Sequence, residues 1–271
     1  MPILMLSANE PLPSMVEKLN KWQPETLVVY ASIGRILADE QLAGHLNITP
    51  RTVTSGSEVL TEETRLRMIQ AWGDQIYNNY AATKGVAAIE CEQHRGMHVM
   101  EDLAIVENVD LNNHPVPAGT YGDKLLVTVL FKYTQPLIRY EIEDSVRFTE
   151  EPCPCGRPFS LIESIQGRIQ EVLSFPGVAG GSVSVHPLIF HNIMDTLPVN
   201  GWQVVQDTDG LHILLAGIHG AIDEKQVHIL VHQALSSQGA VVPLLQIQRV
   251  LSIPQTKAGK TTLVKSNLPD I

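Results

Sequence analysis

Apolar residues recur at two different spacings along this chain, and the spacing changes with position. In the first third, stretches with apolar residues at helical intervals alternate with short β-branched runs. Pro13 and Ser14 form a helix start signal, and Thr61, followed by two acidic residues, is a typical N-cap. Alternating strands and helices are typical of an α/β layer architecture. The pattern predicts helices at 14–22, 32–46 and 61–72, and strands at 26–30 and 75–83.

From about residue 86 the pattern changes to strands separated by turns. Pro115, Pro117, Gly119 and Gly122 mark a loop between two of these strands. This part of the sequence therefore predicts a β-rich subdomain. Its expected strands are 86–91, 98–109, 124–131, 137–144 and 145–150.

The last part of the chain predicts a small unit of its own. A helix at 186–197 and an amphipathic helix at 223–237 flank a hairpin with an Asp-Thr-Asp-Gly turn, and a final strand follows. With one strand before the first helix, the order is β-α-β-β-α-β, which is ferredoxin-like. The predicted fold class is α/β, and the predicted domains are 1–85, 86–168 and 169–271.

Composition narrows the class of protein. With 271 residues, 44% hydrophobic and 18% charged, the chain is expected to bury a substantial core. Its 29 acidic and 19 basic residues give a net charge of −10, which excludes a sequence-independent nucleic-acid surface. No apolar stretch is long enough to cross a membrane, and the first residues lack the positive region of a signal peptide. Three cysteines do not make a disulfide framework, so a reducing cytoplasm is expected.

The cysteines themselves are candidate metal ligands. Cys153 and Cys155 are separated by one residue, and a disulfide between them would be badly strained. Together with Cys91 and His98 they make a Cys₃His set, a common closed structural zinc site. His94 is the weaker candidate of the two nearby histidines. The alternative is that Cys91 is a small buried apolar residue and that the cysteine pair is incidental.

Several short motifs occur in the order found in one family. They are "NNYAATKG", "CEQHRGMH", "PLIRYEIED", "CPCGR", "IQGRIQE" and the terminal "PQTKAGK". In this order they resemble the phenylacetate–coenzyme A ligases of the adenylate-forming superfamily, over nearly the whole chain. The resemblance implies part of a large adenylate-forming domain at 1–85, a zinc-bearing β-rich subdomain at 86–168 and a small ferredoxin-like lid at 169–271.

The resemblance also implies a chemistry. Enzymes of this family join a carboxylic acid to the α-phosphate of ATP, release pyrophosphate and pass the acyl group to coenzyme A. The cofactors implied are ATP or AMP, Mg²⁺, coenzyme A and a structural Zn²⁺, and the substrate implied is a small carboxylic acid. A lysine stabilises the charge that develops at the α-phosphate, and a domain rotates between the two half-reactions.

Individual residues match the motif positions of the family. By resemblance, Tyr80 is the aromatic residue that packs on adenine, and Thr83 is the hydroxyl near the α-phosphate. Asp144 corresponds to the carboxylate that binds the ribose hydroxyls, and Arg168 to the arginine before the hinge. Lys260 corresponds to the mobile lysine of the adenylation step. The structural alternatives are a core tyrosine, a turn threonine, a strand-end aspartate and two solvated cations.

The sequence also departs from the family. Lys84 replaces the glutamate that helps to bind Mg²⁺, which removes a ligand and adds a repulsive charge. Gln170 stands at the usual hinge aspartate. The family's Ser/Thr/Gly-rich phosphate loop is expected to precede residue 1. The segment 52–58 resembles such a loop superficially, but it aligns with a later strand end, and its single glycine leaves little room for phosphate.

Two functions therefore remain open. The first is an acid–thiol ligase of the phenylacetate–coenzyme A ligase type. The second is a degenerate relative that binds nucleotide or a partner protein without turnover. A separate N-terminal polypeptide, or self-association, is a further expectation if exposed apolar surface has to be covered. No nucleic-acid or membrane partner is expected.

Overall fold

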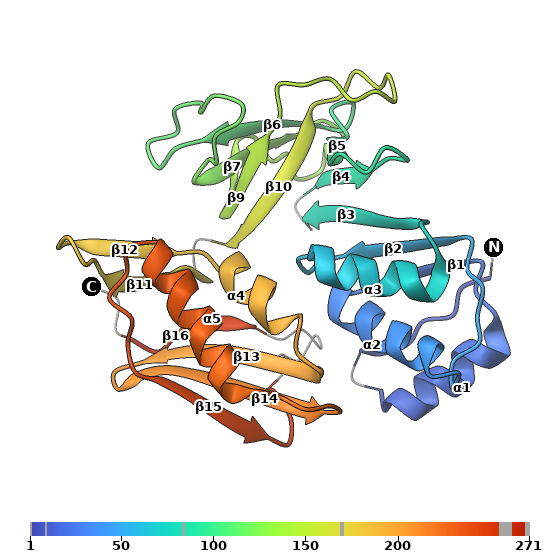
Figure 1. Cartoon of the computed structure of the whole chain (residues 1–271). Coiled ribbons are helices and arrows are strands. Elements are labelled where there is room, and N and C mark those ends of the chain that lie inside the picture. Colours follow the sequence, from blue (N-terminus) through green and yellow to red (C-terminus); the bar gives the residue numbers. More distant parts are fainter. Residues whose placement is uncertain (1, 9, 83–84, 169–170, 255–261, 269–271) are drawn as a thin grey trace. The chain divides into compact units, whose positions relative to one another are not determined.

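The computed structural model of the chain describes residues 2–8, 10–82, 85–168, 171–254 and 262–268 (Figure 1). The chain forms two compact units, and each is described here by itself. The first comprises Leu19–Ile169, and the second comprises Met1–Lys18 together with Gln170–Ile271. Helix α1 (Leu12–Trp22) runs across the point at which the first unit begins.

The first unit is built on a seven-stranded sheet with the order β1-β2-β3-β4-β5-β10-β9. Its first three strands are parallel. Leu27, Val53 and Ile76 lie side by side across them and are buried on the face against which helices α2 and α3 pack (Figure 1). The elements of this α/β layer are β1 (Thr26–Val29), α2 (Ala31–Leu42), β2 (Thr52–Gly56), α3 (Glu62–Trp72) and β3 (Ile76–Ala82).

The local sequence explains where α3 begins. Thr61 is extended, and its side-chain oxygen accepts a hydrogen bond from the backbone N–H of Thr64, as an N-cap does. Glu62 and Glu63 follow in the first turn, where they favour the positive end of the helix dipole. The helix ends at Gly73, whose φ of +87° suits glycine.

The second half of the same sheet is antiparallel and continues directly from β3. The three-stranded sheet β6-β7-β8 shares a hydrophobic core with it, centred on Val99, Leu125 and Ile162. The strands are β4 (Val86–Glu90), β5 (Met97–Val99), β6 (Ala104–Val109), β7 (Lys124–Val129), β8 (Tyr140–Ile142), β9 (Asp144–Phe148) and β10 (Leu161–Arg168).

Three features of this half differ from the prediction. The strand expected at 137–144 is shorter, because β8 ends at Ile142 and Asp144 begins β9. The single strand expected at 98–109 is broken, because a turn at Met100–Leu103 separates β5 from β6 and sends them to different sheets. Strand β10 was not predicted. Its sequence mixes polar and small residues, and two irregularities in its pairing with β9 interrupt the alternation that marks a strand.

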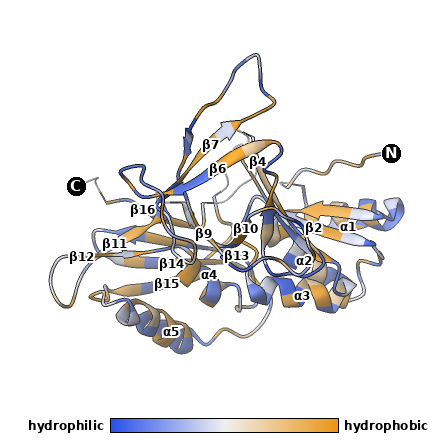
Figure 2. Ribbon diagram, turned by 90° about the horizontal axis from the view of Figure 1, so that it is seen from above, coloured by the Kyte–Doolittle hydropathy of each residue, from blue (hydrophilic) through white to orange (hydrophobic). Residues whose placement is uncertain are grey.

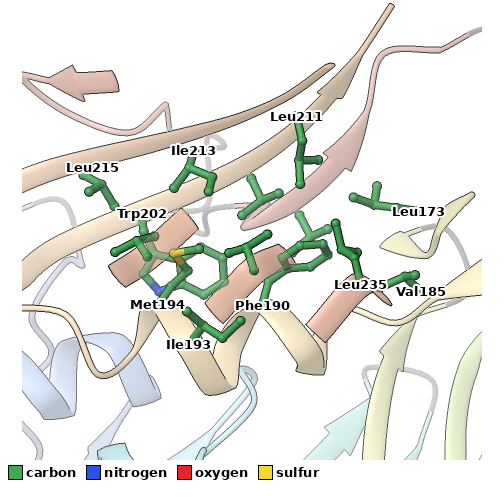
Figure 3. Packing of buried hydrophobic residues seen from close by; sticks show 14 of the residues in the cluster. Leu173, Val185, Phe190, Ile193, Met194, Trp202, Leu211, Ile213, Leu215 and Leu235 are labelled. Atoms are coloured by element: carbon green, nitrogen blue, oxygen red, sulfur yellow. The ribbon is translucent and has the colours of Figure 1, made fainter. Parts of the chain in front are cut away.

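The second unit is organised around a four-stranded sheet and two helices. Phe190 and Met194 of α4 pack against Leu211 and Ile213 of β14 (Figure 3). Helix α5 carries hydrophobic and hydrophilic residues along its length (Figure 2), and it buries Val227, Val231 and Leu235. The elements are β11 (Leu173–Pro176), β12 (Ser182–Val185), α4 (Leu188–Met194), β13 (Val199–Asp207), β14 (Gly210–Ile218), α5 (Glu224–Ser237), β15 (Leu245–Val250) and β16 (Val264–Ser266).

The predicted hairpin is present, with Asp207 opposite Gly210, but the ferredoxin-like strand order is not. The strand before α4 is β12, and it pairs with β11 in a separate two-stranded sheet. Gly180 and Gly181, both with positive φ, turn the chain between these two strands. The main sheet has the order β15-β14-β13-β16 instead, so the short strand β16 occupies one edge.

Candidate functional site

Tyr80 and Asp144 form a hydrogen-bonded pair in the first unit. The Tyr80 hydroxyl donates to Asp144 Oδ2 over 2.6 Å, although 64 positions separate the two residues. Both side chains are half-buried. The pair therefore combines an aromatic ring with a carboxylate at a position that a ligand can reach in part.

The sheet positions both members of this pair. Tyr80 lies in β3 opposite Ala88 of β4 and packs partly against the core shared by the two sheets. Asp144 is the first residue of β9, and its backbone is opposite that of Arg168 in β10. Tyr80 therefore has a contact with the core, as a core tyrosine would, and its hydroxyl also reaches Asp144.

Most of the other predicted nucleotide-binding residues lie outside the part of the chain that the structure describes. Thr83, Lys84 and Lys260 lie outside the described residues, as does Gln170 at the predicted hinge. For Arg168 the structure describes the backbone alone. The structure thus brings together two of the five nucleotide-site residues suggested by the motifs.

The segment 52–58 is not a phosphate loop over most of its length. Residues Thr52–Gly56 form β2, which pairs with β1 on one side and with β3 on the other. A Cβ at Gly56 would lie 3.1 Å from the backbone oxygen of Asn79, so the glycine serves close strand packing. Because the carboxyl ends of β1, β2 and β3 meet at one edge of the sheet, this edge is where an α/β layer places its ligands.

The four predicted metal ligands converge at the other part of the same sheet. One ligand atom from each of Cys91, His98, Cys153 and Cys155 lies within 4.8 Å of the others. Cys91 Sγ is 3.6 Å from Cys153 Sγ, and Cys155 Sγ is 3.3 Å from His98 Nε2. A tetrahedral ion with bonds of roughly 2.0–2.3 Å requires separations close to these. The cluster can therefore hold a metal without large rearrangement.

One strand and two loops supply the ligands of this cluster. His98 lies in β5 between Ile89 of β4 and Leu161 of β10, Cys91 follows β4 directly, and the two remaining cysteines lie between β9 and β10. His98 Nδ1 is 3.4 Å from the carbonyl oxygen of Phe159, which leaves Nε2 directed at the cysteines. Cys91, His98 and Cys153 are buried, so water has little access.

The electrostatic environment separates two of the thiols. Burial raises the pKa of Cys91 to about 11. Burial also opposes ionisation of Cys155, but hydrogen bonds from the Arg157 backbone and from the side chains of Cys153 and Arg157 lower its pKa to about 6. Thiolates are the form that binds metal, so Cys155 is ready to bind at neutral pH and Cys91 must lose a proton.

Sequence reasoning missed two residues beside this cluster. Glu90 is buried and accepts two hydrogen bonds from Arg65 of α3. One signal was available, because Glu90 ends the otherwise apolar run of 86–90 immediately before Cys91. A charged residue at the end of a buried strand predicts a charged partner, but the sequence does not say which one.

Comparison with known proteins adds relatives to this geometry. No protein-family model matches the chain. The chain is 28% identical over 204 residues to a phenylacetate–coenzyme A ligase of Thermus thermophilus, covering 71% of this chain and 44% of the relative. It is 30% identical over 179 residues to protein CapK of Staphylococcus aureus, covering 63% and 38%. The chain thus spans less than half the length of these relatives.

Solved structures agree on the fold. A 2-hydroxyisobutyryl–coenzyme A ligase in complex with R3-HIB-AMP has a TM-score of 0.74 at 20% identity, over 94% of this chain and 57% of that one. An anthranilate–coenzyme A ligase in complex with anthranoyl-AMP has a TM-score of 0.66 at 15% identity, over 93% and 51%. The fold is therefore that of the adenylate-forming ligases.

The similarity to a phenylacetate–coenzyme A ligase agrees with the family that the motifs predicted. The motifs around the cysteines and around Asp144 both lie in the first unit. Among the described residues, no helix has the length and apolar character that crossing a membrane requires.

Proposed function

We propose that this chain provides the residues that bind adenosine in an AMP-forming acid–thiol ligase. The observation that carries the proposal is the hydrogen bond between Tyr80 and Asp144 at 2.6 Å, because it joins the two residues that the motifs assign to adenine and ribose. The relatedness to phenylacetate–coenzyme A ligase and the adenylates named in two neighbouring structures support it.

The chemistry of the pair suits a nucleoside. A carboxylate accepts hydrogen bonds from two adjacent hydroxyls, which is what a ribose offers. An aromatic ring gives a purine a flat surface on which to stack, and such stacking contributes about 1–3 kcal/mol. The Tyr80 hydroxyl fixes one carboxylate oxygen of Asp144, so the other oxygen is oriented before the ligand arrives.

In the proposed reaction, an oxygen of the acid attacks the α-phosphorus of ATP and pyrophosphate leaves. A thiol then attacks the acyl carbon, and AMP leaves with the carboxyl oxygen. Asp144 and Tyr80 bind the adenosine throughout both steps. From the motifs, Thr83 and Lys260 are proposed to contact the α-phosphate and Arg168 to act near the hinge. A bound Mg²⁺ would offset phosphate charge.

We also propose that the cysteine cluster holds a structural Zn²⁺. Three thiols and one imidazole are the donors that zinc prefers, and four protein ligands leave no open position for catalysis. The Arg157 side chain beside Cys155 reduces the net negative charge that three thiolates around one Zn²⁺ create. The role proposed for the metal is to join β5 to the loops that follow β4 and β9.

Pyrophosphate release with a panel of aryl and alkyl acids tests the ligase function. Release that requires ATP and one class of acid, and that is lost in Asp144→Asn, is the expected result. Nucleotide binding without release from any acid would support the second candidate, a relative that binds without turnover. The observation that favours this candidate is Lys84, a cation where the family has a glutamate.

The variant Lys84→Glu separates the two candidates. If the rest of the site is competent, restoring the carboxylate is expected to create or strengthen a dependence of pyrophosphate release on Mg²⁺. An unchanged Mg²⁺ dependence would show that the charge at this position does not limit the reaction.

A further inference from the structure

A buried ion pair connects the metal cluster to the α/β layer of the first unit. Arg65 Nη2 donates to both carboxylate oxygens of Glu90, over 3.0 and 2.9 Å. The Glu90 side chain is 4% exposed and that of Arg65 is 16% exposed, so the pair is shielded from solvent. The contact joins α3 to the last residue of β4, on either side of β3 (Figure 1).

The same two side chains also bind the backbone of β3. Arg65 Nη1 donates to the carbonyl oxygen of Ile76 over 2.8 Å. The backbone N–H of Asn78 donates to Glu90 Oε2 over 2.6 Å. The ion pair therefore fixes two positions of β3, the nearer of which is two residues from Tyr80 in the same strand.

The segment from Cys91 to His94 also contacts β3, through the ring of His94. Cys91, the first metal ligand, comes directly after Glu90, and its carbonyl accepts a hydrogen bond from the N–H of His94. The His94 ring stacks on Tyr77 of β3 with centroids 5.2 Å apart, and its Nδ1 is 3.4 Å from Glu90. His94 has a φ of +50°, an uncommon conformation that such contacts stabilise.

A buried ion pair is weak evidence for stability alone, because well-packed apolar residues often serve as well. Its directional hydrogen bonds make it suited to setting a geometry. Here those bonds reach β3, β4 and α3, and the cluster begins at the next residue. We refer to Arg65, Glu90 and the backbone of 76–78 as the clamp.

We propose that Arg65 and Glu90 are positioning residues that couple occupancy of the metal cluster to the geometry of β3, and so to Tyr80. The link to Tyr80 as a nucleotide contact rests on the function proposed above. A bound metal fixes Cys91, the clamp transmits that constraint to β3, and β3 carries the ring that adenine would contact. The metal then orders the nucleotide site from a distance, without contacting the nucleotide.

Hydrogen–deuterium exchange of the zinc-loaded full chain, before and after chelation, tests this coupling. Chelation is expected to raise exchange in β3 about tenfold, as well as in the segment 91–98. The three-stranded sheet β6-β7-β8 is the internal control and is expected to keep its protection. In Glu90→Gln, which retains an oxygen for the Asn78 N–H but no charge, β3 is expected to exchange quickly with zinc bound, and chelation adds little.

Zinc release to a chelator is the second measurement, and it does not depend on the stability of the metal-free state. Glu90→Gln and Arg65→Met are expected to release zinc about tenfold faster than the wild type. Arg67→Met is the matched control, because Arg67 lies on the same helix and pairs with Asp39 of α2 over 2.5 Å, away from the clamp. If Arg65→Met does not fold, Arg65→Lys, which keeps the charge, takes its place.

The outcomes are distinguishable. Unchanged exchange in β3 after complete zinc removal, or equal zinc release in all four proteins, would overturn the coupling. A chain that binds no zinc would overturn it together with the proposed metal. If β3 responds to zinc but AMP does not bind, the coupling stands and the proposed nucleotide site is wrong.

Discussion

The cysteine cluster and the Tyr80–Asp144 pair belong to the same compact unit, but the chain encloses them to different degrees. In the cluster, three of four ligands are buried and all four ligand atoms converge within 4.8 Å. In the pair, both side chains are half-buried and one hydrogen bond joins them. A closed set of ligands suits a permanent ion, whereas a half-open pair suits a ligand that binds and leaves.

Because of this difference, substitutions in the cluster and in the pair are expected to change different properties of the protein. A change in the cluster removes a proposed metal ligand from β5 or from the loops that follow β4 and β9, so it is expected to appear as lost stability. A change in the pair leaves the sheet intact, so it is expected to appear as lost affinity.

Two neighbouring histidines give the sharpest contrast. His98→Asn is expected to reduce bound zinc from about one per chain to nearly none and to lower Tm by about 10 °C, because a structural metal contributes directly to folding. His94→Asn is the control for ligand identity, since His94 lies outside the four converging residues, and asparagine tolerates its positive φ. Elemental analysis and calorimetry measure both. Zinc retained in His98→Asn would remove this residue from the ligand set.

Gly96 lies between the two histidines and has no room for a side chain. Its φ is +140°, and a Cβ would lie 2.5 Å from the backbone oxygen of Ile162 in β10. Gly96→Ala is therefore expected to push β5 away from β10 and to cost about 2–4 kcal/mol of unfolding free energy. Gly119→Ala, where φ is +78° and no atom lies within 4 Å, is the control at about 1 kcal/mol. Equal losses in urea titrations would contradict the close-packing argument.

Much of this organisation was readable from the sequence. Thr61 predicted the start of α3, and the Asp-Thr-Asp-Gly turn predicted the β13–β14 hairpin, because caps and turns depend on neighbouring residues. The four candidate ligands were named from residue type alone. Their convergence depends on strand register across 62 positions, which no local pattern encodes.

What the sequence did not predict depends on contacts between distant segments. The pairing of β12 with β11, instead of the main sheet, depends on the turn at Gly180 and Gly181 between them. The partner of Glu90 is Arg65, 25 positions earlier, and many arginines were equally plausible. The Tyr80–Asp144 bond likewise required the fold, although family motifs had named both residues.

Tyr80→Phe tests the orienting role of the hydroxyl at the open site. The variant keeps the ring for stacking but removes the donor to Asp144. Because the hydroxyl orients the carboxylate proposed to accept the ribose hydroxyls, AMP is expected to bind about tenfold more weakly. The lost hydrogen bond lies at a half-buried site and is expected to lower Tm by about 2–4 °C. Zinc content is the control and is expected to stay at one. A large loss of Tm with unchanged AMP affinity would assign Tyr80 to the core instead.

Thiol reactivity resolves the two environments within the cluster. In metal-free protein, Cys155 is expected to be alkylated with an apparent pKa of about 6, and Cys91 to stay protonated up to about 11. Because the pKa of Cys155 is lowered by folding, its contacts stabilise the metal-free fold most above about pH 9, and this contribution is lost as pH falls towards 6. Mass spectrometry after pulses of alkylating agent at several pH values measures this order. Faster reaction of Cys91 would contradict it.

Titration of AMP into the zinc-loaded chain, compared with Asp144→Asn, tests whether this pair binds the nucleotide. Saturable binding by the wild type and a loss of at least tenfold in the variant are expected, because the neutral amide replaces the carboxylate that would accept the ribose hydroxyls. Both proteins are expected to unfold at similar temperatures and to carry one zinc. Equal AMP affinity in the two proteins, with both fully folded, would contradict the assignment of this pair to the nucleotide.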